Sequence, residues 1–295
     1  MSTPDGEPVE IATHTLLHLS DTHLTPPGVL YNGVIDADRA VAAAADLIAR
    51  ALADGVGVDA LVVSGDLTDT GDPAAYRRLA DALGTLGPPV VWANGNHDVR
   101  TTLHAELLGR PDEPGKILQQ HDIAGLRILV LDSTVVGAGH GRLEPDHLAE
   151  LAAALDTPAE HGSVVVLHHA PVPPPSPLLA YFTLERASRH ALAATVAGTD
   201  VRLVLAGHHH LAQSGSLAGV PVAVAGSTAI RVDPLARPGH ERTVVAGSLN
   251  LVRLYPDTVT VSVLPLDESL GASQAFAMDE AACAELIARH PIDQE

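Results

Sequence analysis

The sequence predicts a single α/β domain in which strands alternate with helices first and strands predominate later. Up to about residue 206, short apolar runs bounded by turn residues alternate with Ala- and Leu-rich stretches of helical periodicity. Beyond about residue 220, candidate strands follow one another and close the sheet system. We find no internal repeat and no linker between the two parts, so we expect one domain.

The composition is that of a globular, acidic protein. Apolar residues make up 46% of the 295 residues, charged residues make up 18%, and the net charge is −19. The only lysine is Lys116, and basic residues form no cluster in the sequence. A protein that binds a nucleic-acid polymer normally has a basic patch, so we exclude that class of partner.

The chain has many histidines and one cysteine. Its 17 histidines are an unusual supply of imidazole, the commonest transition-metal ligand. The single Cys283 excludes an intrachain disulfide and a thiolate-rich metal site. Residues 1–10 have no signal-peptide pattern, and the most apolar stretch, 217–230, is too short and too interrupted to span a membrane. We therefore expect a cytoplasmic location.

The helices are predicted from amphipathic periodicity and end signals. In Asp36–Ala53, apolar residues recur on one face. A second helix is predicted to begin after Asp72, because aspartate suits the N-cap and Pro73 suits the first helical position. Further helices are predicted near 101–108, 144–155, 184–196 and 279–289.

The strands are predicted from short apolar runs bounded by turn residues. The Pro-rich segment 171–177 cannot form regular structure and is expected to be a stiff surface loop. The predicted strands are 13–19, 59–64, 89–93, 126–131, 163–167, 201–206, 220–225, 248–254 and 258–264.

Polar blocks follow five of these strands where each strand ends. In an open α/β sheet, ligands bind in the crevice beyond the carboxyl ends of the strands. Two adjacent polar side chains at the end of a buried strand, such as Asn96 and His97, are costly to bury unless each has a polar partner or a ligand. The blocks are Asp21-x-His23, Gly65-Asp66, Gly95-Asn96-His97-Asp98, His168-His169 and Gly207-His208-x-His210.

These blocks supply enough ligands for two metal ions. Side chains at i and i+2 of an extended segment point the same way, so two of the blocks can each present two ligands to one cavity. Seven ligands are too many for one transition ion and suit two ions that share a carboxylate. Oxygen and imidazole donors without thiolate fit Fe, Mn, Zn or Co, and such a pair of ions promotes phosphoryl displacement. The candidate ligands are Asp21, His23, Asp66, Asn96, His168, His208 and His210.

In this order, the five blocks resemble the metallophosphoesterase superfamily and, more specifically, the bacterial class III cyclic-nucleotide phosphodiesterases. The resemblance covers roughly residues 14–265 and includes the runs Leu17–His23, Ser64–Asp69 and Leu131–Ser133. It implies a four-layer αββα sandwich of the calcineurin-like type, with two sheets flanked by helices. We expect a leader at residues 1–12, the catalytic domain at 13–265, and an extension with a helix at 266–295.

The resemblance also implies a mechanism. A hydroxide that bridges two metal ions attacks phosphorus in line, and His97 protonates the leaving oxygen, which converts 3′,5′-cyclic AMP to 5′-AMP. The two implied ligand sets share the bridging Asp66. The first set is Asp21, His23, Asp66 and His210, and the second set is Asp66, Asn96, His168 and His208.

Further residues are candidates for contact with substrate. The resemblance implies that Asn96 and His97 adjoin the phosphate. His140 lies in a Gly-rich loop, and His209 is expected to point away from its two neighbours, at the substrate mouth or at the surface. Asp98 is interpreted as orienting a neighbouring histidine. The loop aromatics that could reach a nucleobase, with surface packing as the alternative, are Tyr31, Tyr181 and Phe182.

Three functions stay open at this stage. The first is a dinuclear phosphodiesterase for cyclic nucleotides, with 2′,3′-cyclic nucleotides included. The second uses the same site on another small phosphodiester, such as a glycerophosphodiester. The third is a non-catalytic scaffold, against which the complete ligand set and His97 argue. The expected partner is a small-molecule phosphodiester, and a homodimer is compatible with the sequence.

Overall fold

The computed structural model describes residues 10–266 except 114, 177, 238 and 239, and in addition residues 278, 279, 281, 282, 284 and 285. Most of the predicted leader, 1–12, and most of the predicted extension, 266–295, lie outside the described residues. The same holds for most of the helix predicted over 279–289. The division of the chain at residues 13 and 265 therefore stays a prediction.

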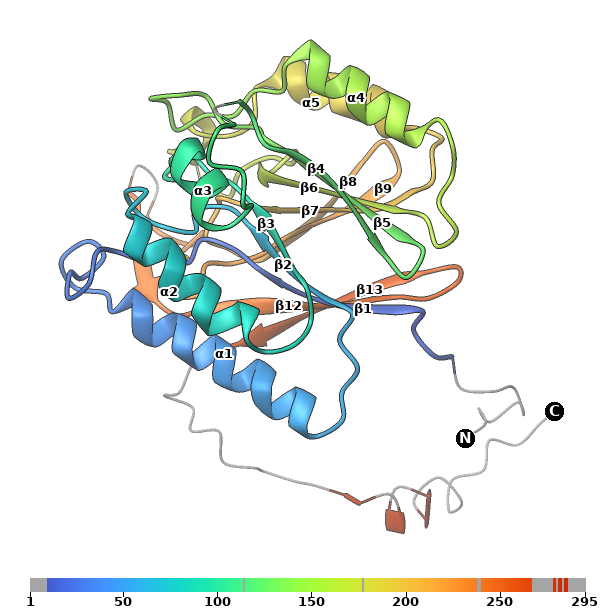
Figure 1. Ribbon diagram of the computed structural model, residues 1–295, viewed down its shortest axis with the longest axis horizontal. Coiled ribbons are helices and arrows are strands. Elements are labelled where there is room, and N and C mark those ends of the chain that lie inside the picture. Colours follow the sequence, from blue (N-terminus) through green and yellow to red (C-terminus); the bar gives the residue numbers. More distant parts are fainter. Residues whose placement is uncertain are drawn as a thin grey trace.

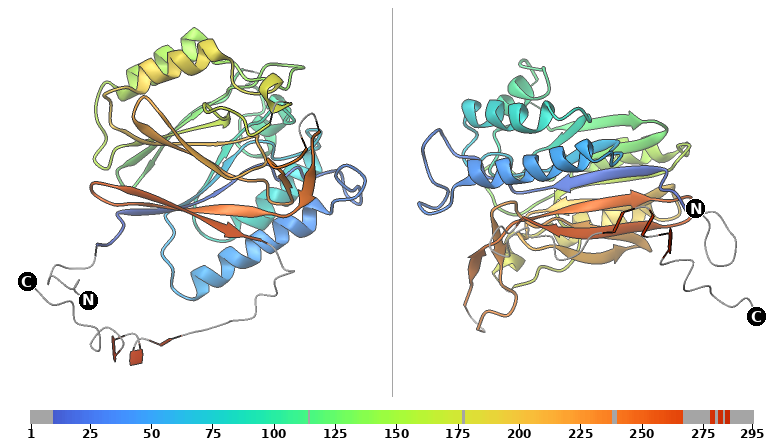
Figure 2. Two further views of the ribbon diagram at one scale, coloured as in Figure 1. Left: turned by 180° about the vertical axis from the view of Figure 1, so that it is seen from behind. Right: turned by 90° about the horizontal axis from the view of Figure 1, so that it is seen from below.

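Two β-sheets lie face to face in the middle of the molecule (Figures 1 and 2). In spatial order, the first sheet consists of β13 (Val259–Pro265), β12 (Ser248–Leu254), β1 (His14–Leu19), β2 (Ala60–Ser64) and β3 (Val90–Ala93). The second sheet consists of β4 (Leu118–Ile123), β5 (Leu126–Leu131), β6 (Ser163–His169), β7 (Val201–Gly207), β9 (Val220–Val224) and β8 (Gln213–Leu217). A separate two-stranded sheet consists of β10 (Ile230–Val232) and β11 (Thr243–Val245).

Helices cover the outer face of each large sheet, which confirms the predicted αββα arrangement (Figure 1). The helices are α1 (Ala37–Ala53), α2 (Pro73–Gly84), α3 (Arg100–Glu106), α4 (Pro145–Leu155), α5 (Arg186–Val196) and a 3₁₀ turn at Leu179–Tyr181. The pair α1 and α2 packs on the first sheet, and the pair α4 and α5 packs on the second. Among the described residues, no helix has the length and apolar character needed to cross a membrane.

The start of α2 shows how local sequence sets a helix boundary. The side chain of Asp72 accepts a hydrogen bond from Ala75 N at 2.9 Å, and Pro73 is the first helical residue. This confirms the predicted N-cap.

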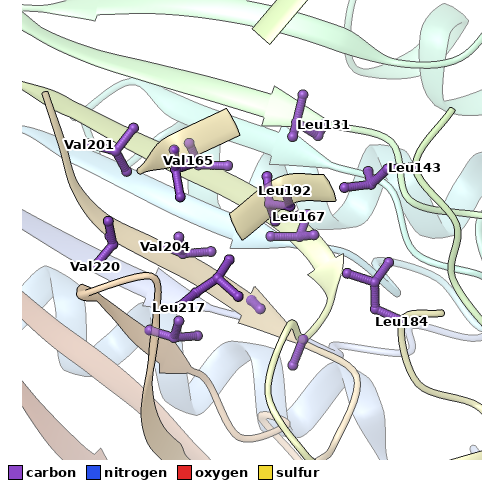
Figure 3. Close-up of a cluster of buried hydrophobic side chains, with 14 of the residues drawn as sticks. Leu131, Leu143, Val165, Leu167, Leu184, Leu192, Val201, Val204, Leu217 and Val220 are labelled. Atoms are coloured by element: carbon purple, nitrogen blue, oxygen red, sulfur yellow. The ribbon is translucent and has the colours of Figure 1, made fainter. Parts of the chain in front are cut away.

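Alternate residues of the central strands face opposite sides of each sheet, and both sides are buried. In β1, Leu16 packs between the two sheets, whereas Leu17 packs against α1 and α2. In β6, Val164 packs between the sheets, and Val165 belongs to the cluster under α4 and α5 (Figure 3). Burial on both faces explains why adjacent residues in the middle of these strands are both apolar.

Four of the described strands, β4, β8, β10 and β11, are not among the strands predicted from the sequence. The sequence of β4 is Leu-Gln-Gln-His-Asp-Ile, and that of β8 is Gln-Ser-Gly-Ser-Leu. Both are edge strands of the second sheet, where polar side chains protect the unpaired edge. Strands β10 and β11 have only three residues each. The apolar pattern therefore detects the central strands and both edges of the first sheet, β3 and β13, but misses both edges of the second sheet.

Candidate metal centre

The structure brings the polar strand ends to one edge of the two sheets. The loop after β1 and helix α3, which follows β3, lie on the same side of the molecule, at the left in Figure 1. Backbone pairing continues beyond the strands, because Asp21 N donates to Gly65 O at 2.9 Å and His23 N donates to Asp66 O at 2.9 Å. These bonds fix the segment after β1 against the segment after β2.

Four of the predicted ligands form a first cluster. Ligand atoms of Asp21, His23, Asp66 and His210 all lie within 4.8 Å of one another. The Nε2 atom of His210 lies 3.1 Å from Asp21 Oδ1 and 3.1 Å from His23 Nε2. Two imidazole nitrogens at this separation need a proton or a cation between them, because two lone pairs would repel each other.

A second cluster shares Asp66 with the first. Ligand atoms of Asp66, His168 and His208 lie within 4.8 Å of one another. The Nε2 atom of His168 lies 3.3 Å from Asp66 Oδ2 and 3.2 Å from His208 Nδ1. On its other side, His168 Nδ1 donates to Ser64 O at 2.9 Å. Because a carbonyl only accepts, the neutral ring carries its proton on Nδ1 and turns the lone pair of Nε2 toward the cluster.

The donors at the two clusters fit transition-metal ions. The Oδ1 atom of Asn96 is buried and has no hydrogen-bond partner among the described residues. A buried polar atom without a partner costs about 1–3 kcal/mol, and a cation would remove this cost. Carboxylate, amide and imidazole donors without thiolate suit Fe, Mn, Zn or Co. The acidic and imidazole members of the clusters are those of the two predicted sets, and their assignment as ligands, with Asn96, stays a prediction.

The backbone at five of the seven predicted ligands is left-handed, which corrects one step of the sequence reasoning. We expected the ligands at i and i+2 to share a cavity because their segments are extended. Instead, left-handed residues aim these side chains. Each such residue costs on the order of 1–2 kcal/mol, which the surrounding structure must offset. Eight described non-glycine residues have positive φ, and five of them are Asp21, His23, Asp66, His208 and His210.

Two glycines allow the loops to approach the clusters closely. A Cβ atom on Gly95 would collide with the Asp66 carboxylate. A Cβ atom on Gly65 would meet the ring of His168, and Gly65 has a φ of +105°. Only glycine permits this packing without displacing Asp66 or His168.

His97 lies beside the first cluster, with its ring 4.8 Å from the ring of His23. Its Nδ1 atom donates to Asp69 O at 3.0 Å and lies 3.2 Å from Asp69 Oδ1, which leaves Nε2 to meet a substrate. Burial alone would lower the pKa of His97. The charges of Asp66 and Asp69 and the Asp69 carbonyl outweigh burial and raise this pKa above its ordinary value. The arrangement suits a proton donor.

Asp69 has a structural role that sequence reasoning missed. Its Oδ1 atom lies 3.6 Å from His23 Nδ1 as well as facing His97, so one carboxylate orients two rings. The sequence does contain a signal that Asp69 belongs to the site, because this residue ends the run Ser64–Asp69 that contributes to the family resemblance. The run alone does not show which side chain Asp69 faces.

The carboxylate of Asp98 binds backbone N–H groups and the Tyr76 hydroxyl. This corrects the interpretation that Asp98 orients a neighbouring histidine. The carboxylate accepts hydrogen bonds from Gly95 N at 2.8 Å, Leu67 N at 3.0 Å and the Tyr76 hydroxyl at 2.9 Å. Burial and the charge of Asp66 raise the pKa of Asp98 to about 6, while its backbone donors limit the rise. Asp98 therefore ties the loop after β3 to the loop after β2.

Two other candidate substrate contacts need correction. The side chain of His209 is 0% exposed, and its Nδ1 atom lies 2.6 Å from Gln213 Oε1, so it offers no surface to a substrate. Tyr31 is also buried and stacks on His23, with ring centroids 4.6 Å apart and an interplanar angle of 12°. Tyr31 supports a predicted ligand and does not reach toward a nucleobase. His140 is partly exposed and stays a candidate contact.

A buried ion pair connects the loop that carries Asn96 and His97 to the second sheet. Arg100 Nε donates to Asp132 Oδ2 at 2.6 Å, and Arg100 also donates to Thr134 O at 2.9 Å. Arg100 begins α3, and Asp132 directly follows β5. The pair therefore fixes the far end of this loop.

We expect Asp132→Ala to lower the free energy of unfolding by about 2–4 kcal/mol, because it leaves a mostly buried guanidinium unpaired. Urea unfolding measures this change. The matched control is Arg77→Ala, which removes the exposed Arg77–Glu106 ion pair and should cost less than about 1 kcal/mol. Equal costs for the two variants would contradict a structural role for the buried pair.

Metal binding should depend on pH through His168. Burial alone would lower the pKa of His168, but the charge and hydrogen bond of Asp66, with Asp21 and the Ser64 carbonyl, raise it to about 9 in the metal-free protein. Burial and the charge of His168 lower the pKa of His208 to about 3, so His208 is already neutral. A metal ion must therefore displace one proton, from His168, at every pH below about 9.

We expect the apparent Mn²⁺ affinity of metal-free protein to rise about tenfold per pH unit between pH 6 and 8. Calorimetry in buffers of different ionisation enthalpy should also detect the release of about one proton per chain from His168 when the metal binds. An affinity that does not change over this range would contradict a protonated His168.

Comparison with known proteins agrees with the fold. The family model described as calcineurin-like phosphoesterase matches residues 14–212. A cAMP/cGMP dual specificity phosphodiesterase of Mycobacterium tuberculosis is 40% identical over 258 residues, which cover 86% of this chain and 80% of that protein. A probable cyclic nucleotide phosphodiesterase of Rhodococcus erythropolis is 38% identical over 274 residues, which cover 91% of this chain and 89% of that protein.

The fold is also shared with solved structures of low sequence identity. A dimetal phosphatase from Danio rerio superposes with a TM-score of 0.59 at 13% identity, covering 85% of this chain and 99% of that one. The family model spans well over half of the chain. The chain therefore belongs to the calcineurin-like phosphoesterase family.

Proposed function

We propose that this protein is a dinuclear, metal-dependent phosphodiesterase that hydrolyses cyclic nucleotides, including 3′,5′-cyclic AMP to 5′-AMP. The observation that supports this most is the position of Asp66, which belongs to two clusters of ligand atoms beside His97. The substrate class is supported by relatives that are named as phosphodiesterases of cyclic nucleotides. A cytoplasmic location and a homodimer stay predictions.

The proposed site residues have two roles: the cluster residues would bind the metal ions, and His97 would transfer a proton. Two ions bound at the clusters would activate water and neutralise the phosphoryl oxygens. His97 Nε2 would donate a hydrogen bond to the phosphate and then give its proton to the leaving ribose 3′ oxygen. Asp69 holds the His97 ring in this orientation and stabilises its charged form.

A metal-removal experiment separates an enzyme from a scaffold. Hydrolysis of bis-p-nitrophenyl phosphate should be rapid with added Mn²⁺, lost after chelation, and restored by adding the metal back. Comparing Fe, Mn, Zn and Co in the restoration step identifies which ions support turnover. A protein that binds metal but shows no hydrolysis with any of the four would be a scaffold.

A substrate panel tests the proposed class. We expect kcat/KM for 3′,5′-cyclic AMP or 2′,3′-cyclic AMP to exceed that for glycerophosphodiesters by at least about tenfold, because the relatives share the cyclic-nucleotide description. A preference for glycerophosphodiesters would replace the proposed substrate and leave the proposed metal site unchanged.

A further inference from the structure

A cavity of about 370 Å³ lies outside the metal clusters, beside the first turn of α5. Its lining includes His140, from the loop after β5, and Tyr181, from the 3₁₀ turn. Glu185, Arg186 and Arg189 line it from the start of α5. The volume falls in the range of small-molecule sites.

The loop that lines this cavity contacts the surroundings of the second cluster. The ring of His169 lies 4.5 Å from the ring of the predicted ligand His208. On its other side, His169 Nε2 donates to Gly139 O at 3.2 Å, and the next residue is His140. Phe182 packs on the same glycine, because a Cβ atom on Gly139 would lie 2.7 Å from the Phe182 ring. Through His169 and Gly139, the loop that lines the cavity therefore contacts the surroundings of the second cluster.

The side chains of two arginines at the cavity have no partner in the part of the chain that the structure describes. Neither the Arg186 nor the Arg189 side chain makes a hydrogen bond or an ion pair there, and Arg189 donates only from its backbone N–H, to Glu185 O. They are three residues apart in α5, so they share one face of the helix. The chain has 36 acidic residues against 17 basic ones, which makes a pair of unpaired guanidinium groups unusual. Guanidinium groups stack on planar rings and donate to ring nitrogen and oxygen acceptors.

The exposed aromatic side chains of the described residues also lie in this region. Tyr181 is 79% exposed and Phe182 is 40% exposed. By contrast, Tyr31, Tyr76 and Trp92 are buried in the fold. In a chain with only 2% aromatic residues, two adjacent exposed rings are a costly feature unless a ligand stacks on them.

We propose that this cavity binds the purine base of a nucleotide whose phosphate lies at the metal clusters. The proposal rests on the proposed function and names the part of the site that selects nucleotides over other phosphodiesters. Tyr181 stacks on the base, and Arg186 and Arg189 donate to its ring nitrogens. Glu185, whose Oε1 atom lies 3.4 Å from His140 Nε2, accepts from the base.

The test compares a substrate that has a nucleoside with one that has none. We expect Arg189→Ala to lower kcat/KM for 3′,5′-cyclic AMP roughly tenfold, mostly through KM, and the Arg186→Ala, Arg189→Ala double variant to lower it further. On methyl p-nitrophenyl phosphate the same variants should lose less than about twofold, because this substrate meets only the metal clusters. Tyr181→Ala should behave like Arg189→Ala. The control is Arg50→Ala, an exposed arginine in the last turn of α1.

A second measurement uses the reaction product. The constant for inhibition of methyl p-nitrophenyl phosphate hydrolysis by 5′-AMP should rise in Arg189→Ala by the same factor as KM for 3′,5′-cyclic AMP. Equal losses on both substrates, or no loss on either, would overturn the base site. A wild-type protein that hydrolyses methyl p-nitrophenyl phosphate but no cyclic nucleotide would overturn the proposed function instead.

Discussion

Asp66→Ala should reduce kcat/KM for 3′,5′-cyclic AMP by at least about a thousandfold. The reason is that Asp66 is the member shared by the two clusters of ligand atoms, so one substitution weakens both metal positions. Two bound ions contribute several kcal/mol to stabilising the transition state, and each 1.36 kcal/mol corresponds to a factor of ten. Kinetics together with elemental analysis of bound metal measures both effects on the same sample.

The control for Asp66→Ala is Asp81→Ala, which removes an exposed aspartate from α2 and should change neither metal content nor rate. Asp66→Asn preserves the shape of the side chain and should still lose most of the bound metal, since it removes the negative charge. If Asp66→Ala kept the wild-type rate, the assignment of a shared ligand would be wrong.

His97→Ala should have an effect that depends on the leaving group. For 3′,5′-cyclic AMP the leaving ribose oxygen needs a proton, so we expect a loss of about 10²–10⁴-fold in kcat. For bis-p-nitrophenyl phosphate the leaving p-nitrophenolate needs no proton, so the loss should be about tenfold or less. The metal content should be unchanged, because His97 meets Asp66 only through its backbone N–H, which alanine retains.

The control for His97→Ala is His190→Ala, an exposed histidine of α5 that should have no effect. Equal losses on the two substrates would mean that His97 only binds the phosphate. Full activity on 3′,5′-cyclic AMP would remove His97 from the mechanism.

The central sheets and the gathering of candidate ligands could be predicted because each depends on a local pattern. Strands β2 and β6 contain the continuous apolar runs 60–63 and 164–167, since they are buried on both faces. The polar residues that interrupt this pattern, at Asp66 and His168, mark the strand ends. The topology of parallel strands then brings these ends to one edge of the sheets.

The parts that could not be predicted depend on contacts between distant segments. The pairing of Asp69 with His97 joins residues 28 positions apart, and Arg100 meets Asp132 across 32 positions. Aspartate tolerates left-handed backbone better than most residues, but the residue type alone does not show that Asp21 adopts it. Burial of His209 likewise depends on Gln213 in the next strand.

The central claim is that hydrolysis requires two ions at the clusters that share Asp66. Titration of Mn²⁺ into metal-free protein tests it most directly, when bound metal per chain and hydrolysis of 3′,5′-cyclic AMP are measured in the same samples. We predict saturation at two ions per chain, with hydrolysis following occupancy of the second site. Full hydrolysis at one ion per chain, or hydrolysis that survives complete chelation, would contradict the claim.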